Sequence, residues 1–291
     1  MLVRMERPAA PYIGNGHYCY ANATAMLLAS VGERLAPDLI EVLTGVGLGA
    51  LWLTEQELFF FGFVAPDRGI SRALALLGFE VAEHAGRDGD APPFRELAEA
   101  LAAGPAVLGP LDMGHLTYAP GRGSATGMDH YVLAYALDAT ELHLHDPAGF
   151  PYVSLPVADL VRAWRAEQVN YRRGPFRWWS APRRLQHPSE RELVAGALRT
   201  FERNYAEADS AAAPGVVTGS LAIRQLAERI AGGELLPHFA GYLVRFVFQL
   251  AARRALDYAA FFEDCWPALA EAKREQAMLF GRCHTLAVRR D

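Results

Sequence analysis

The stretch GHYCYANATAMLL, residues 16–28, places a cysteine at the start of an apolar helix. A glycine-containing loop leads into Cys19, and small apolar residues then recur to Val31 with the 3.6-residue period of a helix. The pattern is apolar on nearly all sides, which is typical of a central, buried helix. Because a helix N-terminus carries partial positive charge, it favours the thiolate form of a cysteine there. The sequence therefore predicts a nucleophilic thiol at Cys19.

The structural alternative is that Cys19 is only a small buried hydrophobe, as single cysteines often are. The other two cysteines, Cys265 and Cys283, fall in helical patterns, and we expect them to be structural. Three widely spaced cysteines give neither a disulfide framework nor a CxxC pair for zinc. The N-terminal segment also lacks the apolar core of a signal peptide. We therefore expect a protein of the reducing cytoplasm.

The overall composition argues against nucleic acid and against a membrane. The 291 residues are 52% hydrophobic and 21% charged, with a net charge of −5. This balance gives no electrostatic basis for binding nucleic acid. The longest apolar region, 235–252, contains His238, Arg245 and Gln249, which favours a buried helix over a membrane span.

The order of predicted elements divides the chain near residue 184. Before this point, predicted helices at 20–31, 37–43, 70–77, 94–103 and 157–167 mix with strands at 59–64, 79–83, 106–109, 128–135, 141–146, 152–155 and 177–180. Successive strands with short turns predict an antiparallel sheet. Beyond it, the sequence predicts helices at 190–208, 220–231, 237–259 and 262–281. The expected class is α+β, with helices packed on an antiparallel sheet over 1–184 and an all-helical domain over 185–291.

Two residues of the predicted sheet could complete a site around Cys19. A thiol nucleophile needs a base within hydrogen-bond reach and a third group that orients this base. His130 begins an apolar strand, and Asp146 ends the next strand along the chain. Because two adjacent antiparallel strands can bring these side chains together, we predict a catalytic triad of Cys19, His130 and Asp146.

Other readings of the same region stay open. Asp146 precedes a proline and could simply begin a turn. His143 and His145 alternate on one face of their strand, which is either solvated, pocket-lining or, with an aspartate, metal-binding. The glycine-rich segment 44–50 matches neither phosphate-binding motif, so it either turns the chain or lines a substrate pocket. We expect no metal and no bound cofactor.

Taken in order, these residues resemble the butirosin-biosynthesis acyltransferase family, butirosin biosynthesis protein H and its relatives. The resemblance covers about residues 10–180, and the helical tail looks like that family's C-terminal part. It implies a papain-like cysteine-peptidase fold for the first domain, similar to the bacteriocin-processing peptidases. The matching features are Gly16-His17-x-Cys19, the segment from Glu41 through Gly45 to Ala50, the segment 107–118 with Asp112, and His130 followed by Asp146-Pro147.

The resemblance implies acyl transfer in secondary metabolism. The member that gives the family its name moves an acyl group from the phosphopantetheine thioester of an acyl carrier protein to an amine, in antibiotic assembly. Carried over, Cys19 attacks the thioester, His130 takes the thiol proton and later activates the amine, and Asp146 orients His130. The implied partners are an acyl or peptidyl carrier protein and a small-molecule amine acceptor, so phosphopantetheine arrives on the carrier. Amide formation and cyclisation both fit this scheme, and a homodimer is left open.

Two further functions fit the same residues. A thioesterase or peptidase would use this triad with water in place of the amine. A catalytically inactive papain-like scaffold would bind a carrier protein or peptide without chemistry.

An arginine-rich segment near the domain boundary is either a solvated linker or a docking patch for an acidic carrier; it contains Arg172, Arg173, Arg177, Arg183 and Arg184.

The oxyanion hole is where the sequence departs from papain-like enzymes. Those enzymes usually carry a glutamine a few residues before the cysteine, and residues 9–15 contain none. The backbone N–H of Cys19 can donate one hydrogen bond to an oxyanion. We expect Asn15 to supply the second donor, and His17 and Asp112 to contact the substrate.

Overall fold

The chain forms two units, and neither is continuous in sequence. The computed structural model describes residues 11–14, 16–55, 57–210 and 214–289. Unit 1 contains the described residues up to Ile40 together with Ile70–His187. Unit 2 contains Glu41–Gly69 and the described residues from Pro188 onward.

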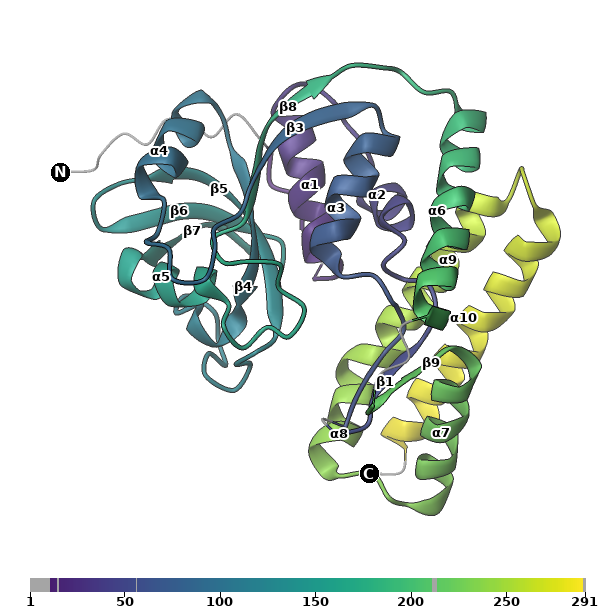
Figure 1. The fold of residues 1–291 in the computed structure, drawn as a ribbon. Coiled ribbons are helices and arrows are strands. Elements are labelled where there is room, and N and C mark those ends of the chain that lie inside the picture. Colours follow the sequence, from purple (N-terminus) through teal and green to yellow (C-terminus); the bar gives the residue numbers. More distant parts are fainter. Residues whose placement is uncertain (1–10, 15, 56, 211–213, 290–291) are drawn as a thin grey trace. The chain divides into compact units, whose positions relative to one another are not determined.

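Unit 1 is built on a six-stranded antiparallel sheet with the strand order β3-β8-β4-β5-β6-β7 (Figure 1). All seven residues of β4 are buried, so this strand lies in the middle of the unit's core. The strands are β3 (Phe79–His84), β4 (Ala106–Asp112), β5 (Asp129–Leu137), β6 (Glu141–Asp146), β7 (Phe150–Pro156) and β8 (Trp178–Arg184).

Helices cover both faces of this sheet (Figure 1). On one face, α4 (Phe94–Ala103) and α5 (Val157–Arg165) share an apolar cluster with β4 and β5, in which Leu97 and Trp164 meet Val132. On the other face lies α1 (Cys19–Ala29), whose Tyr20 packs edge-on against Tyr131 of β5, with ring centroids 6.0 Å apart. Since residues 131 and 132 point to opposite faces of a strand, the two contacts fix α1 opposite α4 and α5.

The central position of α1 confirms what its sequence predicts. Every residue from Tyr20 to Leu28 is buried. The helix ends at Ala29, and Gly32 follows with a φ of 86°, a left-handed conformation that glycine adopts readily. Two further helices, α2 (Pro37–Thr44) and α3 (Pro66–Leu76), lie where the chain leaves unit 1 and where it returns.

Unit 2 combines a small antiparallel sheet with the C-terminal helices. Its strand order is β2-β1-β9, formed by β1 (Leu51–Leu53), β2 (Leu58–Phe60) and β9 (Val216–Thr218). Trp52 and Phe59 of this sheet pack with Leu226, Phe239 and Leu243 from the helices. The helices are α6 (Glu190–Ser210), α7 (Gly219–Gly232), α8 (Pro237–Tyr242), a π-helical turn at Leu243–Val247, α9 (Phe248–Phe262) and α10 (Pro267–Val288).

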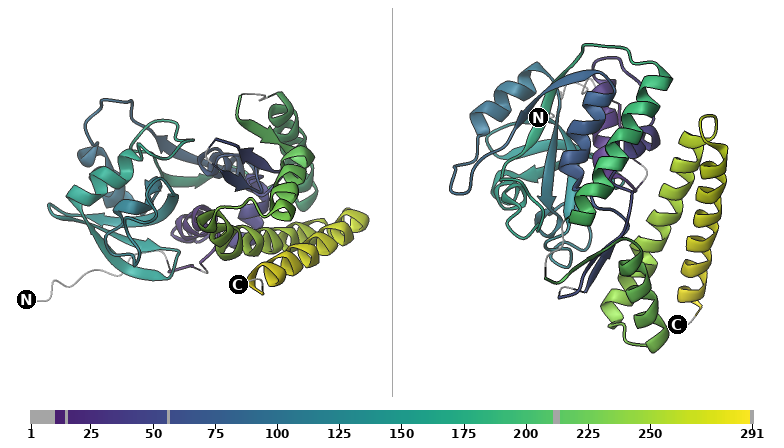
Figure 2. Two further views of the ribbon diagram at one scale, coloured as in Figure 1. Left: turned by 90° about the horizontal axis from the view of Figure 1, so that it is seen from below. Right: turned by 45° about the vertical axis from the view of Figure 1, so that its right-hand side comes forward.

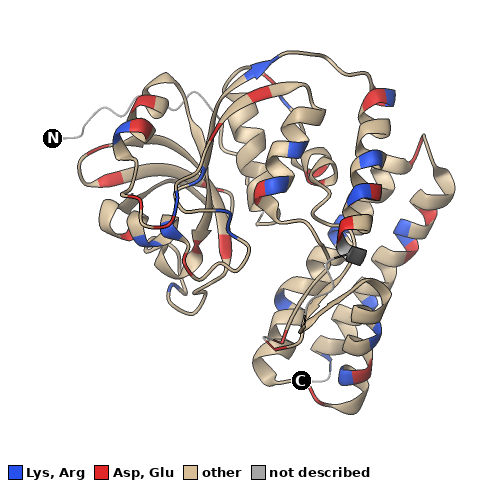
Figure 3. Cartoon of the chain, viewed as in Figure 1, with Lys and Arg blue, Asp and Glu red and all other residues tan. Residues whose placement is uncertain are grey.

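Helices α9 and α10 of unit 2 lie side by side (Figures 1 and 2). Charges of both signs are interspersed along α6 and α10 (Figure 3). Within the described ranges, no single helix combines the length and hydropathy needed to cross a membrane, although α7 and the α8–α9 run pass that test as a pair bent by 119°.

The predicted α+β class with antiparallel strands and a helical C-terminal region is confirmed, but the division of the chain differs from the predicted 1–184 and 185–291. Residues 41–69 belong with the C-terminal helices, because β1 pairs with both β2 and β9. The second part is therefore not all-helical, since β9 lies within it. Strands of three residues are too short to show the alternation from which a strand is predicted.

Candidate active site

His130 and Asp146 form a buried pair at one end of the unit 1 sheet. His130 is the second residue of β5 and Asp146 is the last residue of β6. These strands are adjacent and antiparallel, so the start of one lies beside the end of the other. The His130 Nε2 atom lies 2.7 Å from Asp146 Oδ1, and the two residues are 5% and 1% exposed.

Cys19 completes the group as the first residue of α1. Its side chain is half-buried, and its thiol forms a hydrogen bond with the His130 ring. Because Nε2 of that ring faces Asp146, Nδ1 is the nitrogen left for the thiol. The three residues of the predicted triad are therefore brought together in the order thiol, imidazole, carboxylate.

The charges of this group stabilise one another. Burial lowers the pKa of His130, but Cys19 and the Asp146 carboxylate outweigh it and raise the pKa of His130 well above its usual range. Burial raises the pKa of Asp146, yet His130 and two further hydrogen-bond donors, Ala148 and Tyr118, hold the pKa of Asp146 below its usual value. The arrangement therefore favours an imidazolium held beside a carboxylate, with the thiol on the opposite side of the ring.

Two donors hold the Asp146 carboxylate in place. The Tyr118 hydroxyl donates to Oδ2 at 2.8 Å, and the backbone N–H of Ala148 donates to Oδ1 at 2.7 Å. Burial, and then the nearby Asp146, raise the pKa of Tyr118 well above its usual value, so the phenol keeps the proton that it donates. Asp146 thus has little freedom to turn away from His130.

The loop before Cys19 is fastened to the turn after Asp146. The Tyr12 hydroxyl donates to the carbonyl oxygen of Asp146 at 3.0 Å and accepts from the N–H of Gly149 at 3.0 Å. Gly16 N–H donates to the carbonyl of Pro147 at 3.3 Å. These three bonds connect the segment that carries the thiol with the turn that carries the carboxylate.

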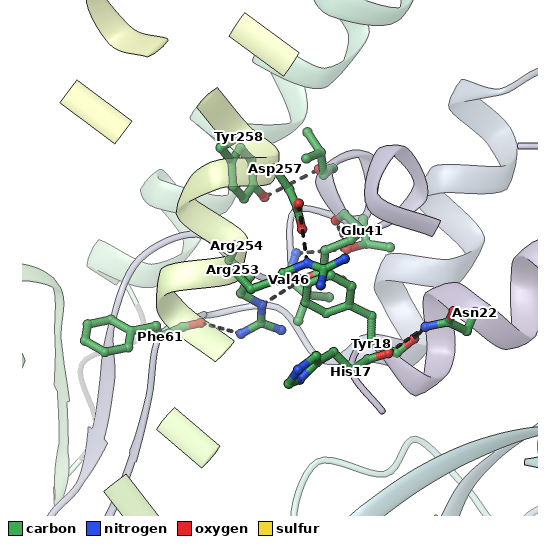
Figure 4. A network of polar contacts seen from close by, with 12 residues as sticks. His17, Tyr18, Asn22, Glu41, Val46, Phe61, Arg253, Arg254, Asp257 and Tyr258 are labelled. Atoms are coloured by element: carbon green, nitrogen blue, oxygen red, sulfur yellow. Dashed lines mark hydrogen bonds and ion pairs between the residues drawn. The ribbon is translucent and has the colours of Figure 1, made fainter. Parts of the chain in front are cut away.

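The backbone makes a sharp turn immediately before Cys19. Tyr18 has φ 52° and ψ 52°, a left-handed conformation that is uncommon for a residue other than glycine. Asn22, one turn into α1, donates through Nδ2 to the carbonyl oxygens of His17 at 2.5 Å and Tyr18 at 3.1 Å (Figure 4). A strained residue held by such bonds next to a reactive side chain is a common feature of catalytic sites.

The remaining predicted site residues have other surroundings. Asn15 lies outside the described residues. His17 is half-buried next to the Tyr18 ring, with centroids 6.3 Å apart. Asp112 is buried, and its Oδ1 accepts from the N–H groups of Gly114 at 2.8 Å and Gly127 at 3.0 Å, so this side chain holds the loop that precedes β5.

The two other histidines of β6 are placed differently from each other. His143 Nε2 pairs with Asp138 Oδ2 at 3.0 Å, whereas His145 is buried and receives the N–H of Tyr152 on Nδ1 at 3.2 Å. Over the described ranges, no group of three or more His, Cys, Asp or Glu side chains is arranged to hold a metal ion.

The arginine-rich segment is paired within unit 1. Arg172 lies 2.8 Å from Asp88, and Arg184 binds Glu33 through both Nε and Nη2. The other pairs are Arg173 and Arg177 with Glu83, and Arg183 with Glu80. Much of the positive charge that the sequence suggests as a docking patch is therefore balanced by carboxylates of the same unit.

Sequence reasoning misses the residues that brace the triad. Tyr12 and Tyr118 contact Asp146 from 134 and 28 positions away, and a single tyrosine gives no local sign of such a contact. Asn22 offers a signal, because an amide inside an otherwise apolar helix needs a buried hydrogen-bond partner.

Two comparisons with known proteins place the chain in a family. A family model described as the YobF C-terminal domain matches residues 212–291. The uncharacterized protein YobF of Bacillus subtilis (strain 168) is 41% identical over 280 residues, which cover 96% of this chain and 90% of that relative. An identity at this level over nearly the full length of both chains shows common descent, and the chain therefore belongs to the YobF family.

Proposed function

We propose that this chain is a cysteine-dependent acyltransferase whose nucleophile is Cys19. The observation that supports it most directly is the buried His130–Asp146 pair at 2.7 Å with the Cys19 thiol on the other side of the imidazole. Nucleophilic catalysis by a thiol needs a base in contact with it and a group that orients the base. We propose further that unit 1 has a papain-like fold, since the thiol begins a central helix and the other two residues lie on the sheet beside it.

In the proposed reaction, the Cys19 sulfur attacks the carbonyl carbon of a thioester carried on phosphopantetheine. The pantetheine sulfur leaves and takes a proton from His130, and a new thioester joins the acyl group to Cys19. An amine then attacks this thioester, His130 accepts the amine proton, and the Cys19 sulfur leaves as an amide forms. Asp146 keeps the ring oriented through both steps.

The oxyanion of each step needs hydrogen-bond donors. The N–H of Cys19 belongs to the first turn of α1, where N–H groups find no acceptor within the helix. It can therefore donate to the oxyanion. Asn15 remains our proposal for the second donor, and His17 for a substrate contact. The carrier protein, the amine acceptor, a role in antibiotic or other secondary metabolism, and a cytoplasmic location belong to the same proposal.

Intact-mass analysis tests the acyl-enzyme. The chain is incubated with a panel of acyl-pantetheine thioesters from acetyl to octanoyl, and we expect the mass of one acyl group to be added. Cys19→Ala removes this adduct, whereas Cys283→Ala, which deletes an exposed thiol on α10, retains it. An adduct that survives in Cys19→Ala contradicts the proposal.

Alkylation by iodoacetamide gives a second measurement that needs no acyl donor. Peptide mass spectrometry reads all three cysteines in one sample, so the exposed Cys265 and Cys283 serve as internal controls. We expect Cys19 to react faster than both, because the His130 ring in hydrogen-bond contact with it can accept the thiol proton. His130→Gln removes this advantage. Equal rates at all three thiols favour the inactive scaffold.

Release of the trapped acyl group separates transfer from hydrolysis. Acyl-Cys19 that decays faster when an amine is added, and yields the amide, supports the transferase. Decay at the same rate with and without the amine, yielding only the free acid, makes the chain a thioesterase with the same triad.

A further inference from the structure

Unit 2 contains a cavity of about 210 Å³ that the proposed acyl transfer does not use. Its walls include the rings of Phe61, Tyr258 and Phe280, while glycines such as Gly219 leave space between them. This volume is many times what a single buried water needs. This is room for a small organic molecule.

One side chain gives this cavity a specific chemistry. Lys273 of α10 lines it and is the only lysine in a sequence with 28 lysine and arginine residues. Its Nζ donates to Gln276 Oε1 at 3.0 Å and lies 5.4 Å from the centre of the Tyr258 ring. Burial lowers the pKa of Lys273, and no carboxylate of the described residues forms an ion pair with it.

The other cation of the cavity is already balanced. Arg254 lies with its Nε 2.7 Å from Glu41 Oε1 and its Nη1 2.9 Å from the carbonyl oxygen of Phe61 (Figure 4). It therefore contributes a wall to the cavity, while Lys273 contributes a positive charge that lacks an acidic partner among the described side chains. The cavity also receives the N-terminus of α7, the positive end of that helix, at Gly219.

We propose that this cavity binds a small organic carboxylate, with its anionic head on Lys273 and its apolar body against the rings of Phe61 and Phe280. A carboxylate supplies the counter-charge that a partly desolvated ammonium lacks, and charge-assisted hydrogen bonds of this kind are strong. A singly charged head fits a site with one unbalanced cation better than a phosphate does. This site is independent of Cys19 and does not rest on the proposed acyl transfer.

Calorimetric titration of the full chain tests the proposal with octanoate and 4-phenylbutyrate, and with octanamide as the uncharged analogue. We expect at least one of the two acids to bind, and octanamide to bind about 10- to 100-fold more weakly than octanoate. Lys273→Met keeps the apolar stem and should weaken acid binding by the same factor, while Lys273→Arg restores it in part. Arg282→Met removes an exposed charge from the same helix and should leave binding unchanged.

Chemical labelling of the single lysine provides a check within the unmodified chain. Reductive methylation by formaldehyde and cyanoborohydride is followed at Lys273 by mass spectrometry, with the terminal α-amine as internal reference. The binding acid should slow methylation of Lys273 at least several-fold and leave the α-amine unaffected. Failure of both acids to bind, equal binding of octanoate and octanamide, or unprotected Lys273 would overturn the proposal.

Discussion

His130 is the residue on which the candidate active site depends, because a carboxylate and a thiol contact its ring on two sides. Asp146 contacts Nε2 and the Cys19 thiol contacts the other side of the ring. Neither contact alone distinguishes a catalytic histidine from a buried structural one. The left-handed turn at Tyr18 sets the direction in which the chain enters α1 at Cys19.

The stability of unit 1 should depend on pH through this pair. The pKa of His130 is raised in the folded chain. The contribution of His130 to the free energy of unfolding is therefore complete below the usual histidine pKa of ~6.5, and it is lost as the pH rises through the raised pKa. The pKa of Asp146 is lowered. The contribution of Asp146 to the free energy of unfolding is therefore complete above pH ~3.8, and it is lost as the pH falls through the lowered pKa. The pair should therefore stabilise the fold most between about pH 4 and pH 6.5.

Asp146→Asn measures this contribution. We expect the variant to lose up to ~3 kcal/mol of unfolding free energy at pH 5.5, since it removes the partner of a buried cation. The loss should shrink toward pH 3 and toward pH 9, because the contribution of Asp146 fades on acidification below ~3.8 and that of His130 fades as the pH rises through its raised pKa. Urea unfolding followed by tryptophan fluorescence at the three pH values gives the comparison. If the difference in unfolding free energy between the unmodified chain and Asp146→Asn stays constant with pH, the two residues do not form a charged pair.

The sequence predicts the three residues that meet in the candidate site and misses the residues that hold them in place. Cys19, His130 and Asp146 carry functional groups whose positions at a helix start and at strand ends can be read locally. Tyr12 and Tyr118 act through contacts that exist only after the chain has folded, so no local pattern marks them. Asp112 is the opposite case. The sequence suggests that it contacts a substrate, whereas its buried carboxylate accepts hydrogen bonds from backbone N–H groups.

Among the elements, the contact of α9 with the start of the 41–69 segment stands out in unit 2. Arg254 of α9 and Glu41 of α2 are 8% and 0% exposed, and their side chains lie 2.7 Å apart. A buried ion pair adds little over an apolar pair of the same size, but removal of one partner leaves a charge without compensation.

Arg254→Met should therefore destabilise unit 2 by about 3–5 kcal/mol. The double variant Arg254→Met with Glu41→Leu should recover much of this loss, because neither charge then remains buried. Arg253→Met serves as the matched control, since its pair with Asp257 spans 3.9 Å and its side chain is 46% exposed. Denaturant titration of the four proteins supplies the free energies; equal losses in the single and double variants would rule out an uncompensated Glu41 as the cause.

Element prediction succeeds where a pattern is long and fails where a strand is short. The helix at 94–103 is found with its predicted ends, and the strand at 141–146 likewise. The three-residue strands β1 and β9 are missed, although both are needed for the small sheet. Their pairing joins residues about 165 positions apart, as in Leu51 with Thr218, and such a partner cannot be read from either segment alone.

At the scale of the whole molecule, the interleaved order of the two units determines which pieces of the chain can fold. A fragment of residues 188–291 contains the helices of unit 2 but lacks Trp52 and Phe59, two aromatic residues of its apolar cluster. It also leaves β9 without β1, the strand with which it pairs.

We expect this fragment to remain largely unfolded or to aggregate, and a fusion of 41–69 to 188–291 through a flexible glycine-serine linker to fold cooperatively. Circular dichroism and the sharpness of urea unfolding distinguish the two outcomes. The matched control carries the same linker and a scrambled 41–69 segment. Cooperative unfolding of the 188–291 fragment by itself would show that the small sheet is dispensable.

The same interleaving has a consequence during synthesis. Ribosomes add ~5–20 residues per second, and the stretch Ile70–His187 separates the two halves of unit 2. Residues 41–69 are therefore made about 6 to 24 seconds before the first residues of α6. Throughout that interval Trp52 and Phe59 have no helical partners, so this short aromatic segment is where a nascent-chain chaperone would find its binding site.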